Sequence, residues 1–120
     1  MNEYQQQLLD HYHSPRNFGA PSFEATHNAK VSNLSCGDEI EIWLEVSADK
    51  IIKNVAFSGE GCSIAIGSAS LLLEELKGKT LDEVKNLSED FQINLVGIPL
   101  TMARLKCATL PFQAVKNSIE

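Results

Sequence analysis

The sequence predicts an α+β fold in which helices pack on one face of a short antiparallel sheet of about three strands. Three observations support this class. Two extended segments separated by a turn lie between residues 39 and 58, helical periodicity follows them directly, and helical patterns also occupy both ends of the chain. A chain of 120 residues is most simply one domain, so we expect residues 1–120 to share a single core.

The clearest strand is predicted over residues 39–46. Apolar residues alternate there with Glu39, Glu41, Trp43 and Glu45; they are Ile40, Ile42, Leu44 and Val46. A period of two is typical of a strand with one buried and one solvated face. The segment SADK predicts a turn, IIKNVAFSG predicts a second strand antiparallel to the first, and a weaker strand is predicted from Ala25 to Ser32.

Four helical segments are predicted around these strands. The first is NEYQQQLLDHY, and the loop HSPRNFGAPS ends it. A central helix begins near Cys62 and ends at Gly78, with one apolar face made of Ala65, Ala69, Leu72, Leu73 and Leu76. Thr80 and Glu83 resemble a capping box for LDEVKNL. The last helix is predicted as ATLPFQAVKNSI, with Pro111 in its first turn, whereas SEDFQINLVGIPLTMARLK predicts no clear element.

Charge and hydropathy exclude several functions. Sixteen acidic against ten basic residues give a net charge of -6, and no cluster of Lys and Arg suits nucleic acid. The apolar runs are too short to cross a bilayer, and the N-terminal segment has no signal-peptide pattern. We therefore expect a cytoplasmic protein with neither a nucleic-acid nor a membrane partner.

The three cysteines are predicted to lie at the boundaries of elements. Cys36 precedes the clearest strand, Cys62 opens the central helix, and Cys107 precedes the last helix. Three cysteines make a poor disulfide framework in a reducing compartment, which leaves buried apolar thiols, metal ligands or reactive thiols. A helix N-terminus at Cys62, and the charges of Arg104 and Lys106 near Cys107, would favour thiolates. Arg104 and Lys106 are equally consistent with a solvated pair of charges.

Asp38 adds a carboxylate to the three thiols. It stands two residues after Cys36, and Gly37 between them lets the backbone bend so that both side chains face one way. Four such groups are the number required by tetrahedral zinc or by the exposed corners of a two-iron cluster. A carboxylate is a weaker ligand for these metals than a thiolate, so the set suits a site that releases its cargo. The spacing itself matches no compact zinc motif.

Four ordered blocks resemble the IscU/SufU/NifU N-terminal-type iron-sulfur cluster scaffolds. The blocks are DHYHSPRNFG, SCGD, GEGCSIAIGSAS and RLKCATL, and they cover nearly the whole chain. The resemblance implies a SufE/NifU-like α+β fold with a metal site at one end, formed by Cys36, Asp38, Cys62 and Cys107. It also implies that SPRNFG is more than a surface loop.

The resemblance further implies an activity. Such scaffolds take sulfur, as a persulfide, from a pyridoxal-phosphate cysteine desulfurase, combine it with iron, and pass the cluster to recipient proteins. They are platforms rather than conventional enzymes. Cys107 is expected to accept the sulfur first because its segment reads as flexible and basic, and Arg104 or Lys106 is expected to favour the anionic persulfide. The other ligands would hold a [2Fe–2S] cluster or zinc.

Some residues depart from each branch of the family. The IscU branch carries histidine where this chain has Lys106, and IPLTMARLK lacks that branch's chaperone-recognition segment. SufU proteins carry an insertion before the third cysteine, whereas only 44 residues separate Cys62 from Cys107 here. The sequence therefore leaves two alternatives beside the scaffold: a zinc-bound SufU-type sulfurtransferase that relays persulfide, and a small zinc-stabilised domain without sulfur chemistry.

Overall fold

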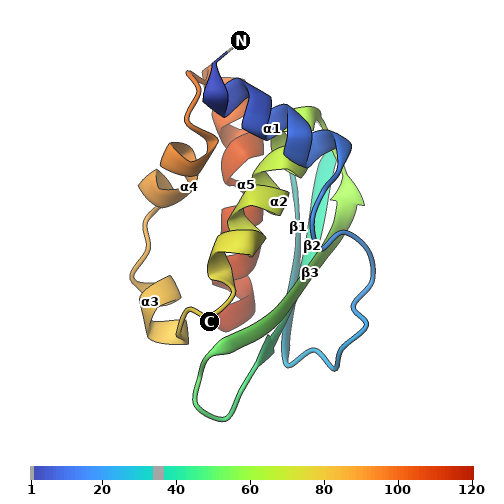
Figure 1. Ribbon diagram of the computed structural model, residues 1–120, viewed down its shortest axis with the longest axis vertical. Helices are drawn as coiled ribbons and strands as arrows, with labels where there is room; N and C mark the ends of the chain where they lie inside the picture. The colour runs from blue at the N-terminus through green and yellow to red at the C-terminus, as the bar shows by residue number, and fades with distance from the viewer. Residues whose placement is uncertain (1, 34–36) are drawn as a thin grey trace.

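A computed structural model describes residues 2–33 and 37–120 and shows the predicted α+β class (Figure 1). It contains a three-stranded antiparallel sheet in the order β1-β2-β3 and five helices. Along the chain the elements are α1 (Glu3–His13), β1 (His27–Asn33), β2 (Asp38–Val46), β3 (Ile52–Glu60), α2 (Ser63–Leu76), α3 (Leu81–Lys85), α4 (Glu89–Val96) and α5 (Met102–Ile119). Among the described residues, no helix is both long and apolar enough to cross a membrane.

The sheet has the predicted alternation. Ile40, Ile42 and Leu44 of β2 are fully buried on the helix-covered face. The register pairs Ile42 with Phe57 of β3, which is also fully buried. Val46, predicted on the same face, is only partly buried because the ladder shifts register at the end of the strand.

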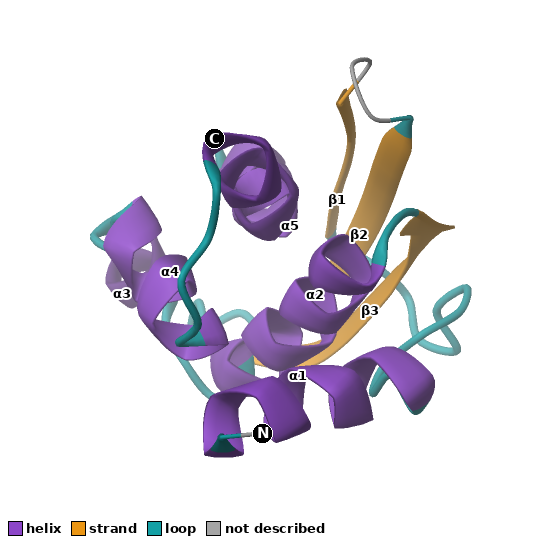
Figure 2. Cartoon of the chain, turned by 90° about the horizontal axis from the view of Figure 1, so that it is seen from above, coloured by secondary structure: helices purple, strands orange, loops and turns teal. Residues whose placement is uncertain are grey.

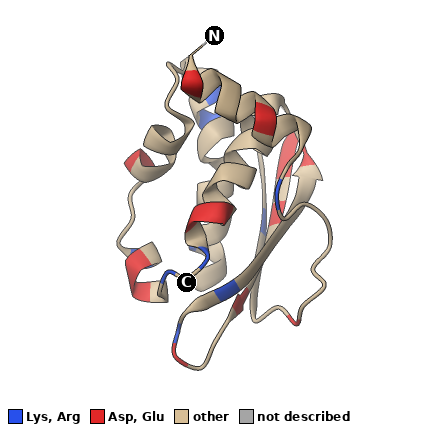
Figure 3. Cartoon of the chain, in the orientation of Figure 1, with Lys and Arg blue, Asp and Glu red and all other residues tan. Residues whose placement is uncertain are grey.

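The helices lie on one side of the sheet, as predicted (Figure 2). α5 packs over β1 and β2, and α2 packs over β3 and against α5. α1 contacts α2, and α4 contacts both α2 and α5, so α1 and α4 form the outer layer. Figure 3 shows Lys and Arg at separate places on several elements, with Asp and Glu on the same elements.

The central helix α2 is buried on more than the predicted face. The expected apolar residues are fully buried, but so are Ser68 and Ser70, and Gly67 faces α1. A methyl group at Gly67 would lie 2.7 Å from a Leu8 methyl carbon, so this glycine sets the close approach of α1 to α2. α2 is therefore a core helix between the sheet and α1, which its apolar stripe alone did not indicate.

The last helix differs from its prediction. It begins at Met102, where the Thr101 hydroxyl accepts a hydrogen bond from the Arg104 amide at 3.3 Å. The prediction that Pro111 lies in the first turn is therefore wrong, because Pro111 lies inside α5. The loss of one backbone hydrogen bond there is offset by burial of the surrounding face of the helix. The segment SEDFQINLVGIPLTMARLK, for which no element was predicted, contains α4. This helix ends at Gly97, which has the left-handed conformation.

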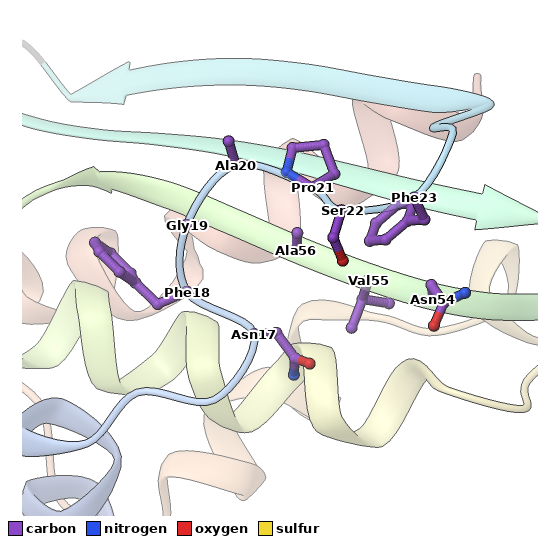
Figure 4. Close-up of a pocket in the computed structure, with 10 residues that line it drawn as sticks. All are labelled: Asn17, Phe18, Gly19, Ala20, Pro21, Ser22, Phe23, Asn54, Val55 and Ala56. Carbon is purple, nitrogen blue, oxygen red and sulfur yellow. The ribbon is translucent and has the colours of Figure 1, made fainter.

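The loop that contains SPRNFG is pinned to two elements, as the resemblance implied. Phe18 bridges to Phe57 at the free edge of β3, with a hydrogen bond from the Gly19 amide to the Phe57 carbonyl at 2.8 Å. The Asn17 side chain donates to Glu74 of α2 at 2.7 Å. The loop then passes over β3 and leaves a hollow of about 240 Å³ beneath residues 17–23 (Figure 4). This segment therefore joins α1 to the sheet and to α2.

A buried histidine completes the attachment. His11 of α1 is 9% exposed, and its Nδ1 lies 2.7 Å from the Ser70 hydroxyl. The same hydroxyl accepts a hydrogen bond from the Arg16 amide at 2.9 Å. Its own proton is then available to Nδ1, which suits a neutral imidazole. Burial lowers the pKa of His11 below the usual 6.5, and the Arg16 charge lowers it further, against smaller opposing effects of Asp10 and Glu74.

We expect the free energy of unfolding to fall when the pH is lowered through the range in which His11 titrates. Because the His11 pKa is lower in the folded state, the unfolded chain binds the proton first, and stability present above about pH 6.5 is lost as the pH falls through the folded-state pKa. Urea denaturation between pH 7.5 and 5.5 measures this loss. The loss of stability should be smaller in His11→Gln than in the wild type, and His13→Gln is the control variant because His13 is an exposed histidine of the same helix. An equal pH dependence in His11→Gln and the wild type would contradict this role.

Candidate metal centre

Three of the four predicted ligands meet at one end of the sheet. One ligand atom each from Asp38, Cys62 and Cys107 lies within 4.8 Å of the other two. Asp38 is the first residue of β2, Cys62 immediately precedes α2, and Cys107 lies on α5. The fourth predicted ligand, Cys36, falls outside the described residues, so its part in the site stays a prediction.

Asp38 is held by the start of α2. Its side chain is buried, with 3% exposure, and its Oδ1 accepts a hydrogen bond from the Cys62 amide at 3.2 Å. The partial positive charge at a helix N-terminus favours such a carboxylate. Gly61 leaves room for it, because a methyl group there would lie 3.0 Å from Oδ1. The GEGC motif therefore supplies both the thiol and the space beside the carboxylate, a role of Gly61 that its presence before the cysteine could have indicated.

Cys62 occupies the predicted position as the N-cap of α2. Its side chain makes no capping hydrogen bond to the helix, and the thiol instead lies 3.8 Å from Oδ2 of Asp38. The residue is exposed. Cys62 therefore presents its sulfur both to the carboxylate and to solvent.

Cys107 does not lie where the sequence placed it. It was predicted to precede the last helix in a flexible segment, but α5 begins at Met102, so Cys107 lies in its second turn. Its exposure is 6%. The Thr101 cap and the helix-forming residues after it start the helix early, and the favourable effect of the helix dipole has largely decayed by the second turn. Cys107 is thus a buried thiol within a helix.

The two nearby cations stay outside the cluster of ligands. Arg104 and Lys106 are both exposed on α5. Arg104 lines an open groove of about 430 Å³, together with Ser63 and Ile64 of α2. Their expected effect on a persulfide remains a prediction.

The donor set fits a thiophilic metal. Around a tetrahedral zinc ion, two thiolate sulfurs are about 3.8 Å apart, and a sulfur and a carboxylate oxygen are about 3.5 Å apart. The Cys62 sulfur and the Asp38 oxygen are already separated by 3.8 Å. The three ligand atoms, within 4.8 Å of one another, need shifts of only about 1 Å to surround one ion. Zinc and iron both accept this combination of soft and hard ligands.

The chain is similar to known proteins over nearly its whole length. Residues 3–120 match the NifU-like N-terminal domain. The chain is 31% identical over 133 positions to the zinc-dependent sulfurtransferase SufU of Bacillus subtilis (strain 168), covering 97% of this chain and 88% of that protein. It is 31% identical over 118 positions to the iron-sulfur cluster assembly scaffold protein IscU of Escherichia coli (strain K12), covering 97% and 91%.

Solved structures share the fold. A crystal structure of FiSufU from Fervidobacterium islandicum AW-1, described as a SUF-system scaffold, superposes with a TM-score of 0.80 at 24% identity, covering 100% of this chain and 96% of that one. The N-terminal part of a NifU-like protein from Brucella abortus gives a TM-score of 0.78 at 20% identity, covering 97% and 91%. At these identities the likeness concerns the fold alone.

The lengths of the two alignments differ. The alignment with SufU has more positions than this chain has residues, so SufU contains residues without a counterpart here. The alignment with IscU is shorter than the chain. This agrees with the expectation that the chain lacks an insertion of the SufU branch. Because the matches span nearly all of the chain, the protein belongs to the NifU-like N-terminal domain family.

Proposed function

We propose that this protein is an iron-sulfur cluster assembly scaffold that accepts sulfur from a cysteine desulfurase and holds a labile [2Fe–2S] cluster for transfer to recipient proteins. The observation that carries this proposal is the convergence of Asp38, Cys62 and Cys107, whose ligand atoms lie within 4.8 Å of one another. A second support is the similarity to IscU scaffolds over 97% of the chain. Cys36 is proposed as the fourth ligand of the cluster.

Each proposed ligand has a distinct part. Cys62 and Cys107 would supply thiolates for iron, and Cys107 would also accept sulfur. Asp38 would supply the oxygen ligand that makes the cluster labile, since a carboxylate binds iron less tightly than a thiolate does. The Cys62 amide orients this carboxylate. The protein would thus hold its cargo without itself performing the desulfuration of cysteine.

A zinc-bound sulfurtransferase is the second candidate. The same donors suit zinc, and the B. subtilis relative is a zinc-dependent sulfurtransferase. In this case Asp38 and the cysteines would hold the ion, and the bound zinc would keep the thiols deprotonated. The protein would then relay persulfide from the desulfurase and build no cluster.

One reconstitution separates the two candidates. The protein is purified anaerobically, its metal content is measured, and it is incubated with a cysteine desulfurase, cysteine and ferrous iron. Visible absorption of a [2Fe–2S] cluster supports the scaffold. Retained zinc with faster desulfurase turnover and no cluster supports the relay. A tightly held ion with no effect on the desulfurase would contradict both.

Asp38→Ala is expected to prolong the lifetime of the reconstituted cluster several-fold. The change removes the weakest ligand, and the buried position restricts access of water to the site. Decay of the visible absorption after addition of a chelator measures the lifetime. Glu60→Ala is a matched control, because it removes an exposed carboxylate at the adjacent end of β3. Faster decay in Asp38→Ala than in the wild type would contradict this role of Asp38.

A further inference from the structure

The helix α4 is attached to the rest of the protein by few buried side chains. Two of its eight residues are buried, Gln92 and Val96, whereas α2 buries eleven of fourteen. The side chain of its N-cap, Ser88, makes no hydrogen bond to the helix. Figure 1 and Figure 2 show α4 on the side of α2 and α5 away from the sheet, and it packs on these two helices. A short helix with so little buried apolar surface is the kind of segment that opens before the rest of a domain unfolds.

One of the two buried residues of α4 is polar and incompletely paired. Gln92 is fully buried, and its Nε2 donates to the Ser68 carbonyl of α2 at 3.3 Å, which is long for a hydrogen bond. Among the described residues, no group pairs with Gln92 Oε1 or with the buried Ser68 hydroxyl. Both groups would bond to water if α4 moved away from α2, so their burial favours an open state of this contact.

The same segment covers the buried thiol of Cys107. Val96 lies in one apolar cluster with Cys107. The linker from α4 to α5 adds Ile98 and Leu100, which pack against that cluster. Ile98 also lines the open groove of about 430 Å³ beside Ser63. Movement of α4 and its linker would therefore uncover Cys107 and extend this groove toward it.

We propose that α4 and residues 97–101 form a flap that opens as a local unit and controls access to Cys107, and that Gln92 and Ser68 set how often it opens. The opening itself does not depend on the proposed function. Only its consequence, control over when metal enters and leaves the site, rests on that function.

Apolar contacts at the surface hold the flap closed. A methyl group at Gly97 would collide with the Tyr4 ring, so this ring of α1 lies directly against the end of α4. Tyr4 is 49% exposed, so the contact separates without disturbing the core. Phe91 and Leu95 are only partly buried against the core, which leaves Val96 as the one fully buried apolar side chain of α4.

Hydrogen exchange of the full chain tests the local opening. In the metal-free protein, amides of residues 89–96 should be protected at least about tenfold less than those of α2. The double variant Gln92→Met/Ser68→Ala removes the unpaired groups and keeps a long unbranched side chain at residue 92, so exchange in α4 should slow about tenfold. Asn94→Gln is the control variant, because it keeps an exposed amide on the same helix and should leave the exchange unchanged.

The reactivity of Cys107 connects the opening to the metal centre. Its alkylation by iodoacetamide, followed by peptide mass spectrometry, should slow in the double variant by the same factor as exchange in α4. Alkylation of the exposed Cys62 should keep its wild-type rate. Val96→Ala shortens the apolar anchor of the flap and should speed up both exchange in α4 and alkylation of Cys107.

Three results would overturn the flap. Equal protection of α4 and α2 would show that no local opening occurs, and unchanged exchange in the double variant would remove the role of Gln92 and Ser68. Slower exchange in α4 with unchanged alkylation of Cys107 would show that the flap does not cover this thiol. None of these measurements uses iron or a desulfurase, so a failed reconstitution and a failed flap are separate outcomes. Circular dichroism of each variant establishes that it is folded.

Discussion

Cys107→Ser is expected to weaken zinc binding at least about 100-fold, because loss of an outer-sphere partner alone already costs about 10–100-fold and this change removes a direct ligand. The serine hydroxyl does not deprotonate at neutral pH and is a poor ligand for zinc. Water cannot easily take its place, because residue 107 is 6% exposed. Competition with a chromogenic chelator measures the affinity.

Two further variants make this result specific. Cys107→Ala should bind zinc as weakly as Cys107→Ser does, although it buries no hydroxyl group. Thr109→Ser should bind zinc as the wild type does, because Thr109 lies on the same buried stretch of α5 and its hydroxyl donates to the Leu105 carbonyl at 3.0 Å, a bond that serine retains. Wild-type affinity in Cys107→Ala would remove Cys107 from the proposed ligands.

Gly59→Ala is expected to reduce the free energy of unfolding by about 2–5 kcal/mol, the sum of backbone strain and overpacking. Gly59 has a φ of 154°, and a methyl group there would lie 2.0 Å from the carbonyl oxygen of Glu39. The obstacle is the backbone of β2, which cannot turn aside as a side chain can. Thermal denaturation should show a fall in Tm of at least roughly 10 °C.

Gly78→Ala is the matched control for this substitution. Gly78 also has a positive φ, 87°, but a methyl group there would meet nothing within 4 Å. Its replacement should cost only the strain of the left-handed conformation, about 1–2 kcal/mol. Equal losses in the two variants would show that the contact between β2 and β3 at Gly59 is not the dominant effect. The carbonyl that the methyl group of Gly59→Ala would displace belongs to Glu39, the residue after the proposed ligand Asp38. Gly59→Ala should therefore also weaken zinc binding.

Short-range patterns predicted most of the elements correctly. The alternation in β2, the turn after it and the periodicity of α1 follow from two- and four-residue spacings that do not depend on the rest of the chain. The capping box of Thr80 and Glu83 is present, with hydrogen bonds of 3.1 Å in both directions. Such signals are local, so the sequence carries them in full.

The errors concern places where packing outweighs a local signal. Pro111 indicated that a helix begins near it, yet α5 runs through it because ten of its residues are buried against the sheet and α2. The burial of α2 on several sides depends on the position of α1, which no periodicity within α2 reports. The segment around Cys107 was predicted to be flexible, yet the helix begins after the cap at Thr101, six residues before Cys107.

By itself the sequence determined which residues bear thiols and carboxylates, which short segments form most of the strands and helices, and which family the four blocks resemble. Only the tertiary structure decided that Asp38, Cys62 and Cys107 meet, and that one of these thiols is exposed while the other is buried. The physical reason is the distance along the chain over which each kind of interaction acts. Hydrogen-bonded turns and side-chain periodicity act over a few residues, whereas the meeting of β2, α2 and α5 depends on apolar burial summed over the whole core.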